Sequence, residues 1–263
     1  MLTLLATMRL IMAGLAMLAG TVAILACSLI RVRVRGVLPA NWVVAGLARV
    51  LCRIFRVRVV CLSPERLRGA VSLVFPNHLS LLDPLVLLSV APMRFVSAVE
   101  VLNYPLIGWM AKVIGTVFVR RSNPDARKAA RTEIAAALHD EPKPPVVLFP
   151  EGRLGLGHAL YPLRYGAFAV AALDHAPYVL CGLRYRPLEV VIWRGGQGES
   201  LWHALWRLVR YAGPVHAEVL PLPAQTPPPD ADTAQMATQA QTALASVLGL
   251  PPEPAVSPPP RMA

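Results

Sequence analysis

VSLVFPNHLSLLDP, residues 71–84, passes from a buried strand through a polar turn to the start of a helix. Val71–Phe75 is a short apolar run with the length and composition of a buried strand. Pro84 suits the first turn of a helix, because the N–H that it lacks would have no partner there. A strand that gives way to a helix through polar residues is typical of an α/β protein, and we expect chemistry at this turn.

His78 and Asp83 stand in this turn. On one continuous helix they would point about 140° apart, so they can meet only if the backbone turns before the helix begins. An aspartate that accepts a hydrogen bond from one ring nitrogen makes the other nitrogen more basic and able to take a proton from a hydroxyl. The same residues also suit a simple helix N-cap at Asp83 and a turn histidine at His78.

Two further buried strands end in charged residues. Val146–Phe149 leads into Pro150-Glu151-Gly152-Arg153, where the glycine allows a tight turn and the arginine offers a planar fork for phosphate oxygens. Thr116–Val119 leads into Arg120 and Arg121. Because successive side chains of a strand point to opposite faces, only one of these arginines can reach a given site. Taken alone, these segments also suit a tight turn with a surface ion pair and a solvated sheet edge. Together the strand ends place a base beside anion binders at one sheet edge.

The body of the chain alternates short apolar runs with helical stretches, which predicts an α/β fold with a largely parallel or mixed sheet flanked by helices. The further strands expected are 94–98, 178–183, 189–193 and 215–220. The helices expected are one beginning at 83–84 and those at 105–113, 125–138, 165–173, 199–211 and 231–248.

The N-terminal segment predicts a membrane anchor. Leu10–Ile30 carries no charge and, as a helix, matches the roughly 30 Å apolar core of a bilayer. Arg9 precedes it and three arginines follow at 31, 33 and 35, which places the following chain in the cytoplasm. A cleaved signal, or a hairpin held in one leaflet with the next helix, is the alternative.

A second helix is expected at Pro39–Phe55, with Arg49, Arg53 and Arg56 opposite an apolar face. It suits the plane of an anionic membrane, and a core helix with a solvated arginine face is the other interpretation. We expect residues 1–60 to be membrane-anchoring helices, residues 61–220 the α/β domain, and residues 221–263 a proline-rich tail with one helix.

Composition agrees with a membrane contact. Hydrophobic residues make up 55% of the 263, charged residues only 16%, and the net charge is +11, so a disordered chain is excluded. Such a basic excess can serve nucleic acid, an anionic membrane or a phosphorylated substrate. The four cysteines are scattered and form no metal-binding spacing, so we expect neither a disulfide framework nor a metal site.

These motifs resemble the glycerolipid acyltransferase family, whose bacterial members include 1-acyl-sn-glycerol-3-phosphate acyltransferases. The resemblance spans roughly residues 71–183 and rests on Asn77, His78 and Asp83; on Gly115, Phe118 and Arg121; on Phe149, Pro150, Glu151 and Gly152; and on the apolar block at 176–179. Arg153 directly follows Gly152, where the family often has threonine and then arginine.

The resemblance implies an enzyme, a 1-acylglycerol-3-phosphate O-acyltransferase of phospholipid biosynthesis that gives phosphatidic acid. His78 and Asp83 would be catalytic, and the substrate-binding residues would be Asn77, Arg121, Glu151, Gly152 and Arg153. The partners implied are acyl-CoA or acyl carrier protein as donor, a lysophospholipid acceptor and membrane lipids, with no cofactor. We expect the inner (cytoplasmic) membrane, with the active site on the cytoplasmic side.

Two alternatives remain open. The 193–210 stretch, with Trp202, His203 and Trp206, resembles that of family members acting on lyso-ornithine lipid, an acceptor without phosphate. From a different class, the chain could be a non-catalytic protein that binds membrane surfaces. Nucleic acid is disfavoured as a partner, because the arginines cluster around apolar segments without exposed aromatic residues between them that would stack on bases.

Overall fold

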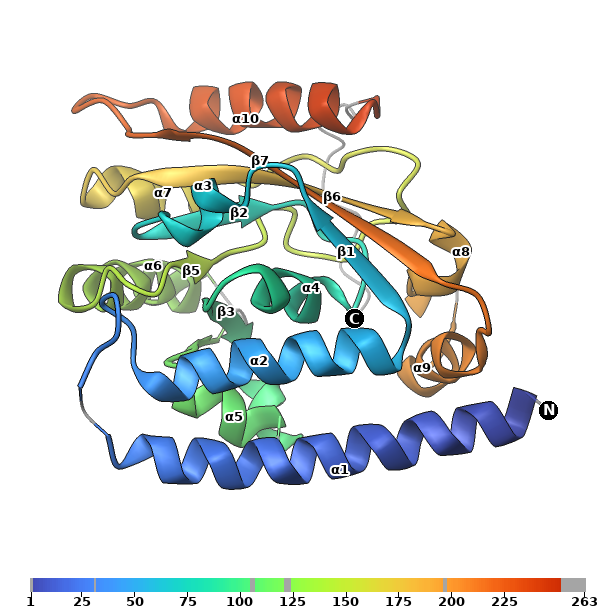
Figure 1. The fold of residues 1–263 in the computed structure, drawn as a ribbon. Coiled ribbons are helices and arrows are strands. Elements are labelled where there is room, and N and C mark those ends of the chain that lie inside the picture. Colours follow the sequence, from blue (N-terminus) through green and yellow to red (C-terminus); the bar gives the residue numbers. More distant parts are fainter. Residues whose placement is uncertain (1, 31, 105–106, 121–123, 196–197, 252–263) are drawn as a thin grey trace.

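The computed structural model describes residues 2–30, 32–104, 107–120, 124–195 and 198–251 (Figure 1). The strands are β1 (Val57–Cys61), β2 (Leu73–Pro76), β3 (Arg94–Ala98), β4 (Val117–Val119), β5 (Val146–Val147), β6 (Tyr178–Arg186) and β7 (Val215–Gln225). The helices are α1 (Leu2–Ser28), α2 (Pro39–Ile54), α3 (Pro64–Arg68), α4 (Asp83–Val90), η1 (Val99–Asn103), α5 (Ile107–Val113), α6 (Pro124–Asp140), α7 (Tyr165–Leu173), α8 (Leu188–Val191), α9 (Leu201–Arg210) and α10 (Thr233–Leu248).

The strands form one 7-stranded sheet in the order β1-β7-β6-β2-β5-β3-β4. Neighbouring strands run parallel except β6 and β7, which are antiparallel, so the sheet is mixed. Helices cover both faces of the sheet, as Figure 1 shows. The predicted α/β fold is therefore confirmed, and the carboxyl ends of β2, β5 and β6 lie at one edge of the sheet.

Two hydrophobic cores fill the space between the sheet and its helices. One core joins the sheet to α2 and α4, and the other joins it to α6, α7 and α10. Strand β6 contributes to both, because Val179 and Cys181 point into the first core while Tyr178 and Leu180 point into the second. This burial on both faces explains why β6 reads as a continuous apolar run in the sequence.

The first two helices form a hairpin along one side of the molecule (Figure 1). Helix α2 buries Val44, Leu47 and Cys52 and packs between α1 and α4. It is therefore a core helix, which was the second of the two interpretations, and Arg49 donates a hydrogen bond to the carbonyl of Ser89 beside it (2.8 Å). Helix α1 is the outer helix, and its Thr3–Ser28 segment is long and apolar enough to cross a membrane, with a mean hydropathy of 2.3.

Arg9 departs from its expected place before the anchor, because α1 begins at Leu2 and carries Arg9 inside it. The Arg9 side chain is buried, and its guanidinium donates to the carbonyls of Val209 and Tyr211 at the end of α9 (2.9 and 2.6 Å). Arg9 thus ties α1 to the body of the protein.

Four elements differ from the sequence expectations, namely α8, β1 and the short helices α3 and η1, of which the last two were not expected. Residues 189–193 were expected as a strand, but Leu188–Val191 is a helical turn, α8. Pro187 precedes it and has no N–H to continue a sheet ladder, while Val190 and Val191 are buried in the helical form as they would be in a strand. Strand β1 was not expected, because its five residues contain Arg58 and lie at the sheet edge beside β7.

The boundaries expected at residues 60 and 220 do not separate packed units. Strand β1 spans residue 60 and pairs with β7, which itself runs to Gln225. Helix α10 packs on the sheet through Met236, Leu244 and Leu248. The tail's helix is therefore part of the α/β body.

Candidate active site

The turn after β2 brings His78 and Asp83 together. The backbone N–H of Asp83 bonds to the carbonyl of Ser80 at 3.1 Å, which closes the turn before α4 begins at Asp83. The Nδ1 atom of His78 then lies 2.7 Å from Oδ2 of Asp83. The side chain of Asp83 is fully buried, whereas that of His78 is 20% exposed. The pair therefore has a sheltered carboxylate and an imidazole that solvent can reach.

The Asp83 carboxylate has partners on both oxygens. Oδ2 also accepts hydrogen bonds from the backbone N–H groups of Leu79 (2.7 Å) and Ser80 (3.0 Å). Oδ1 accepts a hydrogen bond from the hydroxyl of Tyr185 at 2.6 Å. These hydrogen bonds favour a carboxylate that accepts only. Nδ1–H of His78 then donates to Asp83, and Nε2 is left as the basic nitrogen.

The imidazole of His78 is held from one side by an aromatic ring. It stacks on Phe149, with ring centroids 3.9 Å apart and planes inclined by 19°. The carbonyl of His78 accepts a hydrogen bond from the backbone N–H of Gly155 at 2.7 Å. The segment after β5 therefore fixes both the ring and the backbone of His78.

Glu151 supports His78 through its backbone. Its Oε1 accepts from the N–H of His78 at 2.7 Å, and its Oε2 accepts from the N–H of Tyr161 at 3.2 Å. Burial raises the pKa of Glu151 to about 7, against the opposing effect of these two hydrogen bonds, and the nearby charge of Asp83 raises this pKa further. Glu151 was predicted to bind substrate; in the structure both its oxygens accept hydrogen bonds from backbone N–H groups, an arrangement that suits a positioning role.

Gly152 and Arg153 form the exposed end of the same segment. Gly152 has a φ of +69°, which favours glycine, and a Cβ there would lie 3.0 Å from Nε of Arg164. Arg153 is exposed, and its guanidinium lies over the ring of Tyr161, 3.8 Å from the centroid. Arg153 is thus a stacked cation that an anion can approach.

Asn77 has a different place from the one predicted. Its side chain is buried, its Oδ1 accepts from the N–H of Leu183 (2.6 Å), and its Nδ2 donates to the carbonyl of the same residue (3.0 Å). The amide therefore joins the turn to β6, and both of its polar atoms are bonded within the fold. Arg121 lies outside the described residues, while Gly115, which begins its motif, has a φ of +78° beside the side chain of Arg94.

Tyr185 is a site residue that the sequence reasoning missed. The expected strand ended at Leu183, whereas β6 runs on to Arg186 and delivers Tyr185 to the same face as Leu183. Continuing the alternation of the expected strand by two residues beyond Leu183 would have placed Tyr185 on the same face as Leu183. Among the described residues no cluster of three or more histidine, cysteine or acidic side chains could hold a metal ion.

Comparisons with known proteins find acyltransferases. Residues 58–182 match the family described as Acyltransferase. The chain is 32% identical, over 64% of its length and 64% of the relative's, to a lyso-ornithine lipid O-acyltransferase of Pseudomonas aeruginosa. It is 30% identical, over 47% of each chain, to a 1-acyl-sn-glycerol-3-phosphate acyltransferase of Neisseria gonorrhoeae.

A crystal structure of the 1-acyl-sn-glycerophosphate acyltransferase PlsC from Thermotoga maritima has the same fold, with a TM-score of 0.71 over 94% of both chains at 15% identity. The matches to the first curated relatives span 64%, 34% and 40% of those proteins' lengths. Residues 58–182 are therefore similar to the acyltransferase family that the motifs of this chain resemble.

Proposed function

We propose that this protein transfers a fatty acyl group from a thioester to the free hydroxyl of a lysolipid, with His78 as general base. The observation that carries this proposal is the 2.7 Å contact between Nδ1 of His78 and the buried, fully bonded carboxylate of Asp83. Among the described residues Nε2 of His78 has no hydrogen-bond partner, so it is free to accept a proton from a hydroxyl.

The reaction needs no covalent acyl-enzyme. Nε2 takes the hydroxyl proton as the lysolipid oxygen attacks the thioester carbonyl, and Asp83 stabilises the imidazolium that forms. The tetrahedral intermediate then collapses, the C–S bond breaks, and the thiolate recovers the proton from His78. Acyl-CoA and acyl carrier protein both supply such a thioester. The products are the diacylated lipid and the free thiol.

The first candidate acceptor is 1-acyl-sn-glycerol-3-phosphate, which would give phosphatidic acid. It is supported by Arg153, an exposed cation on the segment after β5 that also bonds His78. We propose that Arg153, together with Arg121, binds the acceptor's phosphate, since arginine forks match phosphate oxygens. Gly152 shapes the turn that presents this arginine.

The second candidate acceptor is lyso-ornithine lipid. It is supported by the 32% identity to the Pseudomonas aeruginosa lyso-ornithine lipid O-acyltransferase. An ornithine headgroup has no phosphate, so the two candidates place different demands on the groups around His78. A non-catalytic binding protein is the weaker alternative, because membrane binding would not require a buried carboxylate aligned on a histidine.

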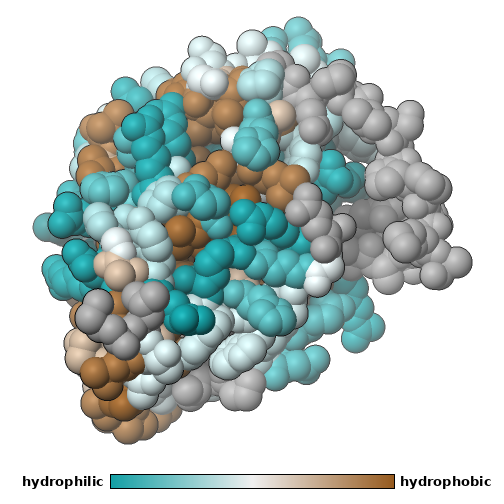
Figure 2. All heavy atoms as spheres, turned by 90° about the vertical axis from the view of Figure 1, so that its right-hand side faces the viewer, coloured by the Kyte–Doolittle hydropathy of each residue, from teal (hydrophilic) through white to brown (hydrophobic). Residues whose placement is uncertain are grey.

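We place the protein at the inner membrane with His78 on the cytoplasmic side. Helix α1 exposes a row of large apolar side chains, among them Leu15, Leu18 and Val22. Figure 2 shows a hydrophobic patch at the lower left of the molecule. Arg33 and Arg35 follow the C-terminal end of α1, which agrees with anionic lipid headgroups on the cytoplasmic side.

The test is an assay of membranes carrying the full chain, with labelled acyl-CoA and either lysophosphatidic acid or lyso-ornithine lipid as acceptor. We expect labelled diacyl product with one of these acceptors, and His78→Ala should abolish it. His139→Ala is the matched control, because His139 lies at the exposed end of α6. Full activity in His78→Ala would overturn the assignment of the general base.

A further inference from the structure

Helix α9 exposes large apolar side chains that the chemistry described above does not use. Trp202 is 68% exposed, Leu201 and Leu205 are exposed beside it, and Trp206 is half-buried. Single exposed apolar side chains are ordinary on a protein surface, whereas a group of them on one short helix marks a surface that meets a partner. We call these four residues the apolar patch of α9.

The apolar patch lies on the side of α9 that also meets α1. Trp202, Leu205 and Val209 recur at helical spacing and point to the same side of α9. Val209 is fully buried, and its carbonyl accepts a hydrogen bond from the guanidinium of Arg9 in α1 at 2.9 Å. Figure 1 shows α9 beside the N-terminal part of α1. Helix α1 therefore meets this side of α9 at its C-terminal end, and Trp202 lies two turns away on the open part of the same side.

The exposed face of α1 points away from α9. Ala6 and Arg9 are buried on one side of α1. Leu4, Met8 and Ile11 lie on the opposite side of this helix and are exposed. When this exposed face lies in the apolar layer of a bilayer, α9 stands one helix diameter further out, about 10 Å, which is the level of the lipid headgroups.

The residue types of α9 suit the headgroup level of a membrane. A tryptophan ring has an apolar body and one N–H, and it prefers the interface between lipid and water. Arg210 is exposed, and it has no hydrogen bond or ion pair with any described residue. Arg56 is exposed as well and donates to the carbonyl of Ala212, just after α9, at 2.7 Å. An apolar side next to free arginine charge is typical of a helix that lies in the plane of an anionic membrane.

Helix α9 is bonded to the catalytic turn through α8. The guanidinium of Arg207 in α9 donates to the carbonyls of Val190 (3.3 Å) and Ile192. Ser80 of the catalytic turn forms a backbone bridge with Ile192, and its hydroxyl donates to the carbonyl of Val191 at 2.7 Å. The position of α9 therefore determines the position of the turn that carries His78.

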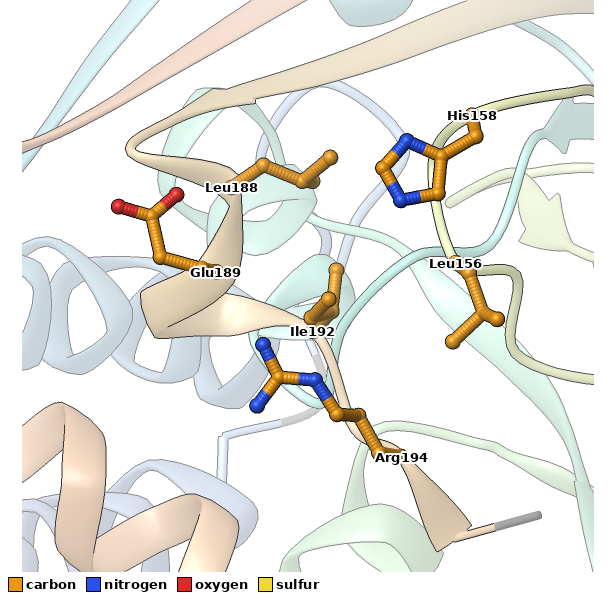
Figure 3. Close-up of a pocket in the computed structure, with 6 residues that line it drawn as sticks. All are labelled: Leu156, His158, Leu188, Glu189, Ile192 and Arg194. Carbon is orange, nitrogen blue, oxygen red and sulfur yellow. The ribbon is translucent and has the colours of Figure 1, made fainter. Parts of the chain in front are cut away.

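The other side of α8 borders a pocket. Figure 3 shows Leu188 and Ile192 on the α8 side of this pocket, which has a volume of about 280 Å³, with Leu156 and His158 on its far side. Helix α8 is thus enclosed by packing at α9 and at the catalytic turn and stays open only toward this pocket.

We propose that α9 is a second membrane-contacting helix, whose apolar patch lies at headgroup level against an anionic lipid bilayer beside α1. One membrane-bound helix leaves the protein free to roll about the axis of that helix, whereas a second contact away from this axis stops the rolling. Because α8 bonds α9 to the catalytic turn, the second contact holds His78 at a fixed height above the lipid surface. This inference goes beyond the proposed acyl transfer, and the contact of α9 can be measured without it.

Tryptophan fluorescence measures the contact directly. The full chain is placed in vesicles of phosphatidylglycerol and phosphatidylcholine that contain lipid brominated near the headgroup end of its acyl chain. Trp202→Phe should lose at least about twice as much of the bromine-quenched emission as Trp193→Phe, because Trp202 lies at the bilayer surface. Trp193 is the matched control, since its indole N–H donates to the carbonyl of Glu199 within the fold at 2.9 Å. Equal losses in the two variants would overturn the proposal.

An acceptor supplied in two forms tests the role in orientation. Trp202→Glu should lower the rate with acceptor embedded in vesicles about tenfold, because it replaces apolar contact with a charge that anionic lipid repels. The rate with a short-chain acceptor dissolved in water should stay within about twofold. Leu173→Glu is the matched control, since Leu173 is exposed at the end of α7, on the face of the sheet opposite to α2.

The other outcomes separate this proposal from its alternatives. Equal losses with both forms of the acceptor, or an unchanged rate in vesicles, would overturn the role in orientation. If the apolar patch met a second copy of the chain instead, brominated lipid would not quench Trp202 and Trp202→Glu would convert dimers in detergent to monomers, which would also overturn the proposal. Absence of transfer by the unmodified protein would refute the proposed function and leave the fluorescence test of α9 unaffected.

Discussion

The carboxylate of Glu151 accepts a hydrogen bond from the backbone N–H of His78 at 2.7 Å, so the segment after β5 controls where the catalytic turn after β2 lies. Its second oxygen binds the N–H of Tyr161. One buried acid therefore joins the backbone of His78 to the loop that closes the opposite side of the site.

Glu151→Gln should impair the chemical step. A glutamine has one acceptor oxygen, so its NH₂ group would face one of the two backbone N–H groups and leave it unpaired, at a cost of about 1–3 kcal/mol. We expect kcat to fall at least about tenfold with the KM for acyl-CoA little changed, because the variant displaces His78 rather than a donor contact. Steady-state kinetics check this against Glu133→Gln, an exposed residue of α6. Equal kcat values in the two variants would contradict the positioning role.

The same residue predicts how stability changes with pH. Burial raises the pKa of Glu151 from 4.5 to about 7, so between these values the folded protein holds a proton that the unfolded chain releases. The quantity to compare is the unfolding free energy of the unmodified protein minus that of Glu151→Gln. This difference should be highest below about pH 4.5 and should fall by up to about 3 kcal/mol by pH 7. Chemical denaturation of both proteins across this range measures the difference. A difference that does not vary with pH would show that folding does not raise the pKa of Glu151.

Much of the site could be predicted from the sequence because its parts follow buried strands. The polar residues after β2 and β5 had to lie at one sheet edge, and α7 has the predicted limits Tyr165–Leu173. The partners of these side chains were not predictable. Asn77 and Glu151 bind backbone groups of Leu183, His78 and Tyr161, which become neighbours only through the sheet order. Residue type reveals that a side chain is polar, but not which donor it meets.

Tyr185→Phe should test the support of Asp83 from β6. The change removes the hydroxyl that donates to Oδ1 of Asp83 and keeps the buried ring. We expect kcat to fall about tenfold or more, in keeping with about 1.5–3 kcal/mol for one hydrogen bond to a charged group, with the KM values unchanged. Tyr178→Phe is the matched control, since its hydroxyl bonds to Gln225 on the other face of the same strand. A larger loss of activity in the control than in Tyr185→Phe would refute the link to Asp83.

Arg153→Ala should distinguish the two candidate acceptors. Arg153 is exposed and stacked on Tyr161, so its removal takes away a cation without opening the core. If Arg153 binds phosphate, the KM for lysophosphatidic acid should rise about tenfold while that for acyl-CoA changes little. Initial rates with each substrate varied in turn give both constants, with Arg68→Ala as the exposed control. A parallel rise for donor and acceptor would contradict selective binding of the headgroup.

Arg9→Met should loosen α1 from α9 without releasing the protein from the membrane. Methionine keeps much of the length of the buried side chain but loses the hydrogen bonds to the carbonyls of Val209 and Tyr211. Unpaired buried carbonyls cost about 1–3 kcal/mol each, so the last turn of α9 should open more often and trypsin should cut after Arg210 several times faster. The apolar face of α1 is unchanged, so the variant should still sediment with membranes. Arg53→Met, on the exposed side of α2, is the control, and equal cleavage rates in the two variants would show that Arg9 does not hold these helices together.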